Sequence, residues 1–146
     1  MTKNYKILGK FIKDMSSETK DVETYLFVKD RITKYKLDLD IKSEALKDKI
    51  VGVYTSLKFS DKEEVKKKSY FEIIYTTIVR VEDQIEKKEL EKIILCDVQE
   101  EIRPDLEKAF ENILNNSGYT GFKFEKKIDF EQLYKQKIKQ NNFFLN

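Results

Sequence analysis

The 146-residue sequence contains no histidine, one cysteine, one proline and four glycines. Without histidine, the chain lacks the commonest general base and the commonest zinc ligand, so we predict neither a catalytic centre nor a metal site. The lone cysteine, Cys96, excludes an intrachain disulfide and favours a reducing compartment. It lies in an apolar run and is interpreted as a small buried residue. The glycines form neither a GxGxxG nor a Walker pattern, so no phosphate-binding cofactor is expected and the protein is predicted not to be an enzyme.

Long apolar runs are also missing. The longest, such as 93–96, span about four residues, whereas a membrane helix needs about 20. The first 15 residues contain lysines but no continuous apolar core, so they do not form a signal peptide. We therefore expect a cytoplasmic protein without stable membrane insertion.

Charged residues make up 38% of the chain, yet the net charge is only +2. Of the 29 basic residues three are arginines, Arg31, Arg80 and Arg103, and the rest are lysines. Arginine is favoured over lysine for recognition of phosphates and bases, and here basic and acidic residues alternate along the chain. The composition therefore argues against a nucleic-acid partner.

Hydrophobic periodicity predicts four strands. The clearest covers 34–42, where every second residue is apolar and the residues between are charged. In 50–59 apolar residues again alternate, and 69–82 is apolar on both faces, so both of its faces should be covered. In the first strand, 5–18, the alternation places Ile12, Asp14, Ser16 and Glu18 on one face. The charge run 60–68 is interpreted as a solvated hairpin loop.

Helical spacing follows these strands. A short helix is possible within 19–32, and 85–96 has helical spacing before a longer helix that we expect to begin at Pro104. Gly118 suits the left-handed residue after that helix. A second capped helix is expected near residue 129. The helical stripe is Leu106, Ala109, Phe110, Ile113 and Leu114, and the second cap comprises Ile128, Asp129, Gln132 and Leu133.

Strands followed by helices predict an α+β fold, with a four-stranded antiparallel sheet and two main C-terminal helices packed on one side. The chain shows no repeat and no linker. We expect one domain over residues 1–140 and a short C-terminal tail over 141–146.

Three sequence blocks carry a family resemblance. They are KFIKDMSSE (10–18), YKLDLDIKS (35–43) and the segment 104–134, which contains Gly118-Tyr119 and Asp129-Phe130 at a characteristic spacing. In this order the blocks resemble the bacterial protein-export chaperone family SecB. The resemblance implies a non-enzymatic chaperone that holds unfolded secretory precursor proteins in apolar grooves and delivers them to the translocation motor SecA. It also implies a homotetramer built as a dimer of dimers.

The resemblance assigns three groups of residues. The motor-binding surface corresponds to Asp14, Glu18, Tyr70 and Glu72, which could equally be ordinary solvent-facing side chains. The client groove corresponds to Tyr35, Leu37 and Leu39, although an alternating strand more often faces its own core. The oligomer interface corresponds to Phe71, Ile73 and Tyr75, because a second apolar strand face must be buried against something.

Two other functions remain open at this stage. A SecB-like chaperone could protect a dedicated client such as an antitoxin, and the weakly basic charge permits this. A sheet with stacking aromatics such as Tyr70, Phe71 and Tyr75 could bind RNA, but acidic residues are interleaved with these aromatics and arginine is scarce.

Overall fold

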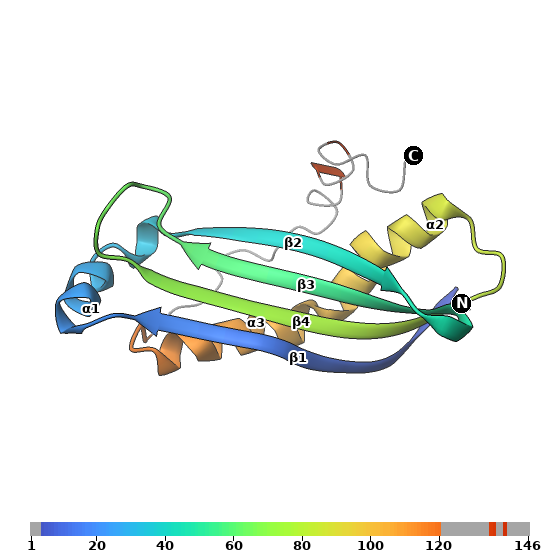
Figure 1. Ribbon diagram of the computed structural model, residues 1–146, viewed down its shortest axis with the longest axis horizontal. Helices are drawn as coiled ribbons and strands as arrows, with labels where there is room; N and C mark the ends of the chain where they lie inside the picture. The colour runs from blue at the N-terminus through green and yellow to red at the C-terminus, as the bar shows by residue number, and fades with distance from the viewer. Residues whose placement is uncertain (1–3, 121–134, 137–138, 140–146) are drawn as a thin grey trace.

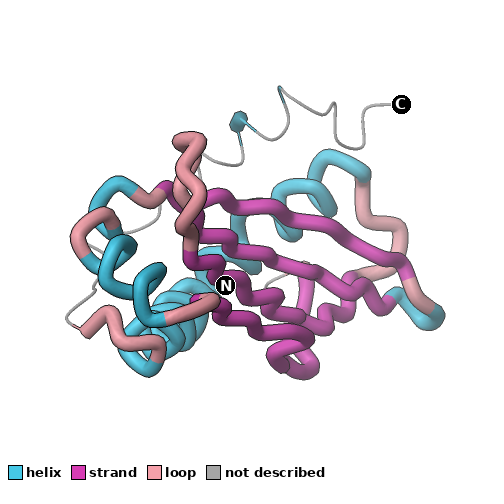
Figure 2. Tube along the Cα trace, turned by 60° about the vertical axis from the view of Figure 1, so that its left-hand side comes forward, coloured by secondary structure: helices cyan, strands magenta, loops and turns pink. Residues whose placement is uncertain are grey.

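The computed structural model describes residues 4–120, 135–136 and 139 (Figure 1). Its centre is one antiparallel sheet with strand order β1-β4-β3-β2. The strands are β1 (Tyr5–Thr19), β2 (Lys36–Ala45), β3 (Ile50–Ser60) and β4 (Ser69–Val81). Figure 2 shows them side by side, with β1 and β2 at the two edges. All four predicted strands are confirmed.

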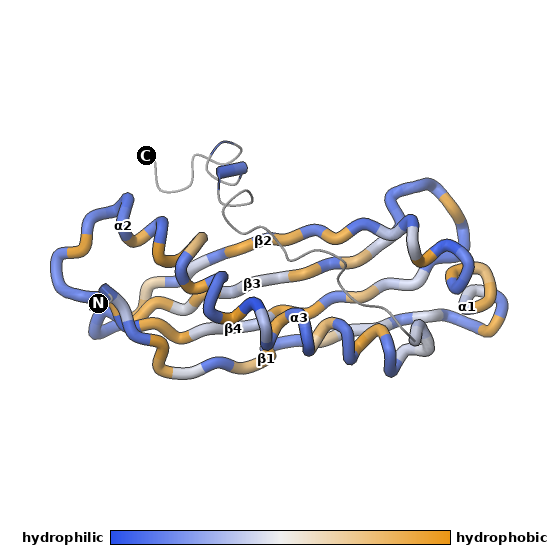
Figure 3. Tube along the Cα trace, turned by 180° about the vertical axis from the view of Figure 1, so that it is seen from behind, coloured by the Kyte–Doolittle hydropathy of each residue, from blue (hydrophilic) through white to orange (hydrophobic). Residues whose placement is uncertain are grey.

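The main helical segment lies on one face of this sheet (Figures 1 and 3). It consists of α2 (Lys87–Lys92), a π-helical turn η3 (Ile93–Asp97) and α3 (Val98–Asn116). At the opposite end of the sheet from α2 lies α1 (Val22–Lys29), which is followed by a 3₁₀ turn η1 (Ile32–Lys34). A second 3₁₀ turn, η2 (Lys47–Lys49), joins β2 to β3. The predicted α+β architecture, with helices on one side of the sheet, is confirmed.

The core lies between the sheet and these helices. The helical stripe on α3 is buried as its spacing predicted, with Leu106, Phe110 and Leu114 fully inaccessible. From the sheet, Phe59 contacts three other rings. Its ring centroid lies 5.4 Å from that of Tyr35, 6.2 Å from Phe71 and 5.8 Å, edge to face, from Phe110. The aromatic cluster thus joins three strand regions to α3.

Strand β1 departs from regular alternation. Its pairing with β4 shifts between Ile7 and Gly9 and again between Ile12 and Asp14. An extra residue at each shift reverses the face that the following side chains occupy. Ile12, which pairs with Tyr75, therefore lies on the helix-facing side, and the prediction that it shares a face with Asp14 is wrong.

The helix around Pro104 begins earlier than the sequence suggested. Pro104 lies inside α3, so the prediction that it occupies the first helical turn is wrong. The π-helical turn explains the difference, because it carries the chain from α2 directly into α3. Gln99, fully buried after this turn, donates from Nε2 to the Ile94 carbonyl at 3.0 Å and accepts from the Thr55 hydroxyl at 3.0 Å. Sequence periodicity does not report such a turn, since it assumes a constant 3.6 residues per turn.

Gly118 ends the helix with a φ of 99°, which confirms the predicted left-handed residue. Its Cα faces Tyr25, and an added Cβ would lie 2.7 Å from the Tyr25 ring. The Tyr25 hydroxyl also donates to the Gly118 carbonyl at 2.7 Å. The second predicted helix cap, near Asp129, and the tail over 141–146 lie outside the described residues.

Candidate functional site

The two faces of the sheet differ in their environment. Odd-numbered residues of β4 face the helices and are buried, whereas even-numbered residues, from Tyr70 to Arg80, lie on the opposite face, here called the outer face. This division sorts the predicted site residues into two surfaces.

The predicted motor-binding residues share the outer face. Across the β1–β4 pair, Glu18 lies opposite Tyr70, and Glu72 lies opposite Ser16, between Asp14 and Glu18. Side chains diagonal to one another across an antiparallel pair are neighbours. The structure therefore brings all four predicted residues into one patch, which we call the acidic patch. Tyr70 is 45% exposed, and Glu72 lies 3.7 Å from the Lys58 ammonium of the next strand.

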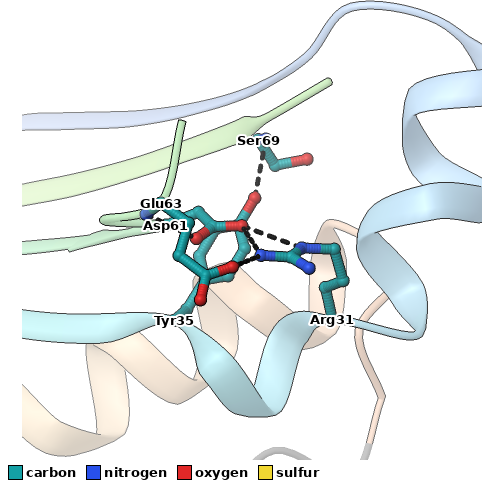
Figure 4. Close-up of polar contacts among 5 residues, drawn as sticks. All are labelled: Arg31, Tyr35, Asp61, Glu63 and Ser69. Atoms are coloured by element: carbon teal, nitrogen blue, oxygen red, sulfur yellow. Dashed lines mark hydrogen bonds and ion pairs between the residues drawn. The ribbon is translucent and has the colours of Figure 1, made fainter. Parts of the chain in front are cut away.

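The predicted groove residues lie on the other side of the sheet, along edge strand β2. Leu37 and Leu39 are partly buried and pack on the edge of the core, whereas Tyr35 is buried. The Tyr35 hydroxyl accepts a hydrogen bond from the Ser69 amide at 3.0 Å (Figure 4). Burial raises the pKa of Tyr35, although the Ser69 amide partly opposes this shift. The edge strand therefore offers two partly covered leucines beside one fixed tyrosine.

The predicted interface residues require a correction. Phe71 and Ile73 are completely inaccessible and Tyr75 is buried, all within the protomer's own core. The Phe71 ring, for example, meets that of Tyr119 edge to face at 5.5 Å. Because both faces of β4 are apolar in sequence, periodicity could not tell which one the helices cover. These three side chains are not available to meet a second subunit.

Strand β1 supplies an exposed apolar edge that the sequence-based assignment missed. Within the described part of the chain it is the longest strand, and no described strand pairs with it on the side away from β4. Leu8, Phe11, Ile12 and Met15 are each 41–56% exposed. Ile12 and Met15 also line a mostly apolar pocket of about 370 Å³ against the Ala109 and Ile113 side of α3. The sequence signal was the presence of apolar residues on both faces of the predicted first strand, as at the adjacent Phe11 and Ile12.

Helix α1 is a second feature that the sequence-based assignment missed. Its apolar side chains Val22, Leu26 and Phe27 are 74%, 56% and 39% exposed. The helix begins at an N-cap where Asp21 Oδ1 accepts from the Thr24 amide at 2.8 Å. The 3₁₀ turn η1 connects the helix to β2 in the chain, while the helix itself packs against β1 and β4.

Among the residues that the structure describes, no helix is long and apolar enough to cross a membrane. Within the same residues, no three potential metal ligands of the His, Cys, Asp and Glu types come together.

Comparison with known proteins is consistent with this arrangement. The family model described as "Preprotein translocase subunit SecB" matches residues 1–141. A protein of Pelagibacter ubique (strain HTCC1062), named "Putative protein-export protein SecB", is 62% identical over 138 residues, which cover 94% of this chain and 99% of that protein. A solved structure of a SecB-like chaperone from Mycobacterium tuberculosis, in complex with an antitoxin peptide, matches with a TM-score of 0.64 and 9% identity. That match covers 84% of this chain and 86% of the other, and it supports the fold alone.

Proposed function

The chain belongs to the SecB family, and from this premise we propose that it is a cytoplasmic chaperone that binds unfolded precursor proteins and delivers them to the motor SecA. The observation that carries this proposal is the partly covered apolar edge at Leu37 and Leu39; α1, which precedes β2 in the chain, supplies further exposed apolar side chains. A folded protein that exposes contiguous apolar surface commonly uses it to bind a partner.

The occupant that we propose is an extended apolar segment of an unfolded chain. Its backbone can pair with the side of edge strand β2 that no other described strand occupies, and its apolar side chains can cover the two leucines. Burial of apolar area supplies about 25 cal/mol per Å², which is independent of the client's exact sequence. This physics suits a binding site that must accept many different precursors.

Refolding experiments test the proposal directly. A slow-folding precursor diluted from denaturant should refold more slowly in the presence of this protein, because the unfolded chain is captured. The same precursor, once folded, buries its apolar segments and should not bind. Unaltered refolding rates at a large excess of the protein would refute the proposed function.

For delivery, we propose that SecA docks on the acidic patch. The three carboxylates can attract a basic segment, while the exposed Tyr70 ring offers an aromatic anchor beside them. The patch lies on the opposite face of the sheet from the groove leucines, so a client and the motor can be bound together. The slightly basic net charge implies that the attraction is local and not a property of the whole molecule.

For assembly, we propose that two protomers pair through the β1 edge and that two pairs form the tetramer. This edge carries backbone groups that no other described strand pairs with, together with exposed Phe11, Ile12 and Met15. An open edge of this length is a template for pairing with another chain. A second copy of β1 would satisfy the backbone and cover these side chains by two-fold symmetry.

The second candidate is a SecB-like chaperone with one dedicated client, such as an antitoxin. The solved complex with an antitoxin peptide shows that a chaperone of similar fold binds such a segment. The refolding experiment separates the two functions, since a general export chaperone should delay several unrelated precursors. A dedicated chaperone should delay only its own client and should not bind SecA.

A further inference from the structure

Helix α1 has few anchors in the core. Thr24 and Val28 are its buried side chains, and the partly buried Tyr25 donates its hydroxyl to the Gly118 carbonyl at 2.7 Å. The remaining apolar side chains, Val22, Leu26 and Phe27, are 39–74% exposed. Contacts with the neighbouring β3–β4 loop add to these few anchors.

Arg31, two residues after α1, makes these contacts (Figure 4). Its Nε donates to Asp61 Oδ2 at 3.0 Å, and its Nη2 lies 2.9 Å from the same oxygen. Nη2 also donates to Glu63 Oε2 at 2.6 Å. On the helix side, the guanidinium carbon lies 5.5 Å from the centre of the Phe27 ring. One side chain thus joins α1 to two carboxylates of the loop, Asp61 and Glu63.

Asp61 is buried, so its carboxylate needs the Arg31 cation beside it. Its side chain is 2% exposed, and its second oxygen accepts from the Glu63 amide at 3.0 Å. A buried carboxylate that loses its cation is strongly unfavourable, so Asp61 holds Arg31 firmly. A second ion pair, Lys67 Nζ to Glu23 Oε2 at 2.9 Å, ties the same loop to the first turn of α1. The charge run 60–68, which the sequence analysis interpreted as a solvated loop, is therefore attached to helix α1 by ion pairs.

We propose that Arg31 is a positioning residue for client binding, which holds α1 so that Leu26 and Phe27 present a preorganised apolar surface to the unfolded chain. This inference rests on the proposed function and names a determinant of the same client surface. A planar guanidinium suits the role because it can bridge two carboxylates and contact an aromatic ring at once. A lysine ammonium cannot reproduce all three contacts.

The test compares Arg31→Met with Arg103→Met. Arg103 is a matched control, because its side chain also lies near two carboxylates, Glu100 at 2.7 Å and Glu107 at 3.7 Å, but on α3. Affinity is measured by fluorescence anisotropy with reduced, carboxymethylated α-lactalbumin, a permanently unfolded polypeptide. Because the α1 side chains lose their preorganisation, Arg31→Met should bind the unfolded polypeptide about tenfold more weakly than the parent. The affinity of Arg103→Met should equal that of the parent.

A double-mutant cycle with Leu26→Ala separates positioning from general loss of stability. If Arg31 acts through α1, Leu26→Ala weakens binding in the parent but has little further effect in Arg31→Met. The inference is overturned if the two effects simply multiply, or if both arginine variants lose the same affinity. Should Arg31→Met fail to fold, Arg31→Lys enters the same cycle with the same expectations. If the parent protein binds no unfolded polypeptide, the proposed function is refuted. If the parent binds but the effects of the Arg31 and Leu26 substitutions are independent, only the positioning role of Arg31 is refuted.

Discussion

Replacing the two groove leucines together, by Leu37→Ala and Leu39→Ala, should weaken client binding by about 30-fold. Full burial of a leucine side chain contributes about 1.5–3 kcal/mol. Both side chains already pack partly on the core, so a client can cover only the remaining area. We take this remainder as about 1 kcal/mol for each residue. Two such losses give about 2 kcal/mol, which corresponds to about 30-fold in Kd.

The assay is titration of a labelled unfolded precursor at a temperature well below the unfolding transition of both proteins. Alanine is preferred to a charged residue because it removes apolar area without adding a repulsive group. Leu46→Ala is the matched control, since Leu46 is 52% exposed in the connection that leaves β2, next to η2. This change removes the same three carbons as each groove substitution, but from a leucine outside the groove, and should change Kd by less than about twofold.

A folded double variant that binds the precursor as tightly as the parent would refute the assignment of β2 as the groove strand. Equal weakening by the double variant and by Leu46→Ala would refute it as well, because apolar area alone would then decide the affinity. Circular dichroism and solution mass are needed for both proteins, to show that neither fold nor assembly has changed.

Four further outcomes are expected. The double variant Asp14→Lys, Glu72→Lys should weaken SecA binding several-fold and leave client binding unchanged. The loss of affinity should be smaller at 1 M salt, where the screening length is about 3 Å. Unchanged SecA affinity at low salt would refute the acidic patch as the docking site. Met15→Glu should lower the solution mass toward that of the 17.5 kDa protomer, whereas an unchanged tetramer would remove the β1 edge from the interface. Gly118→Ala should lower the free energy of unfolding by about 1–2 kcal/mol or more, because it adds a left-handed penalty and a contact with Tyr25; denaturant titration checks this. Asp61→Asn should flatten the acid side of the stability profile, as measured by thermal unfolding against pH.

The direction of the change expected for Asp61→Asn follows from the surroundings of the Asp61 carboxylate. Burial alone would raise its pKa, but the Glu63 amide and the Arg31 guanidinium outweigh burial and hold the pKa below the ordinary value of 3.8. The ionised form therefore stabilises the fold above that value, and this contribution is lost as the pH falls through the lowered pKa. Asparagine does not titrate, so the Asp61→Asn variant should not lose this contribution at low pH. If its unfolding temperature falls with acid as steeply as that of the parent, the reasoning is wrong.

How much the sequence could reveal differed between elements. The alternation in β3 correctly assigned its buried face, from Val51 to Phe59, because only that face is consistently apolar. In β4 both faces are apolar, so the pattern could not decide whether Phe71 or its neighbours lie inward. The choice depends on where α3 packs, which is a tertiary property.

Irregular geometry limited the prediction elsewhere. The shift between Ile12 and Asp14 adds a residue to β1, and no period of two can anticipate it. The π-helical turn similarly hid the true start of the helix that contains Pro104. The sequence could place Asp14 and Glu18 on one face because both follow the bulge, and Tyr70 and Glu72 on one face because they lie on a regular strand. The contacts of Arg31 with Asp61 and Glu63 were not predicted, since these partners are 30 and 32 positions away in the sequence.

The open β1 edge has a consequence for how the stability of this fold should be described. If pairing covers Phe11 and Met15, part of the free energy of folding comes from association and not from the protomer alone. The unfolding temperature should then rise with protein concentration, by mass action. Newly synthesised chains would pass through a stage in which the edge is complete but uncovered, when the correct partner competes with aggregation. A chaperone of this kind would itself depend on prompt assembly.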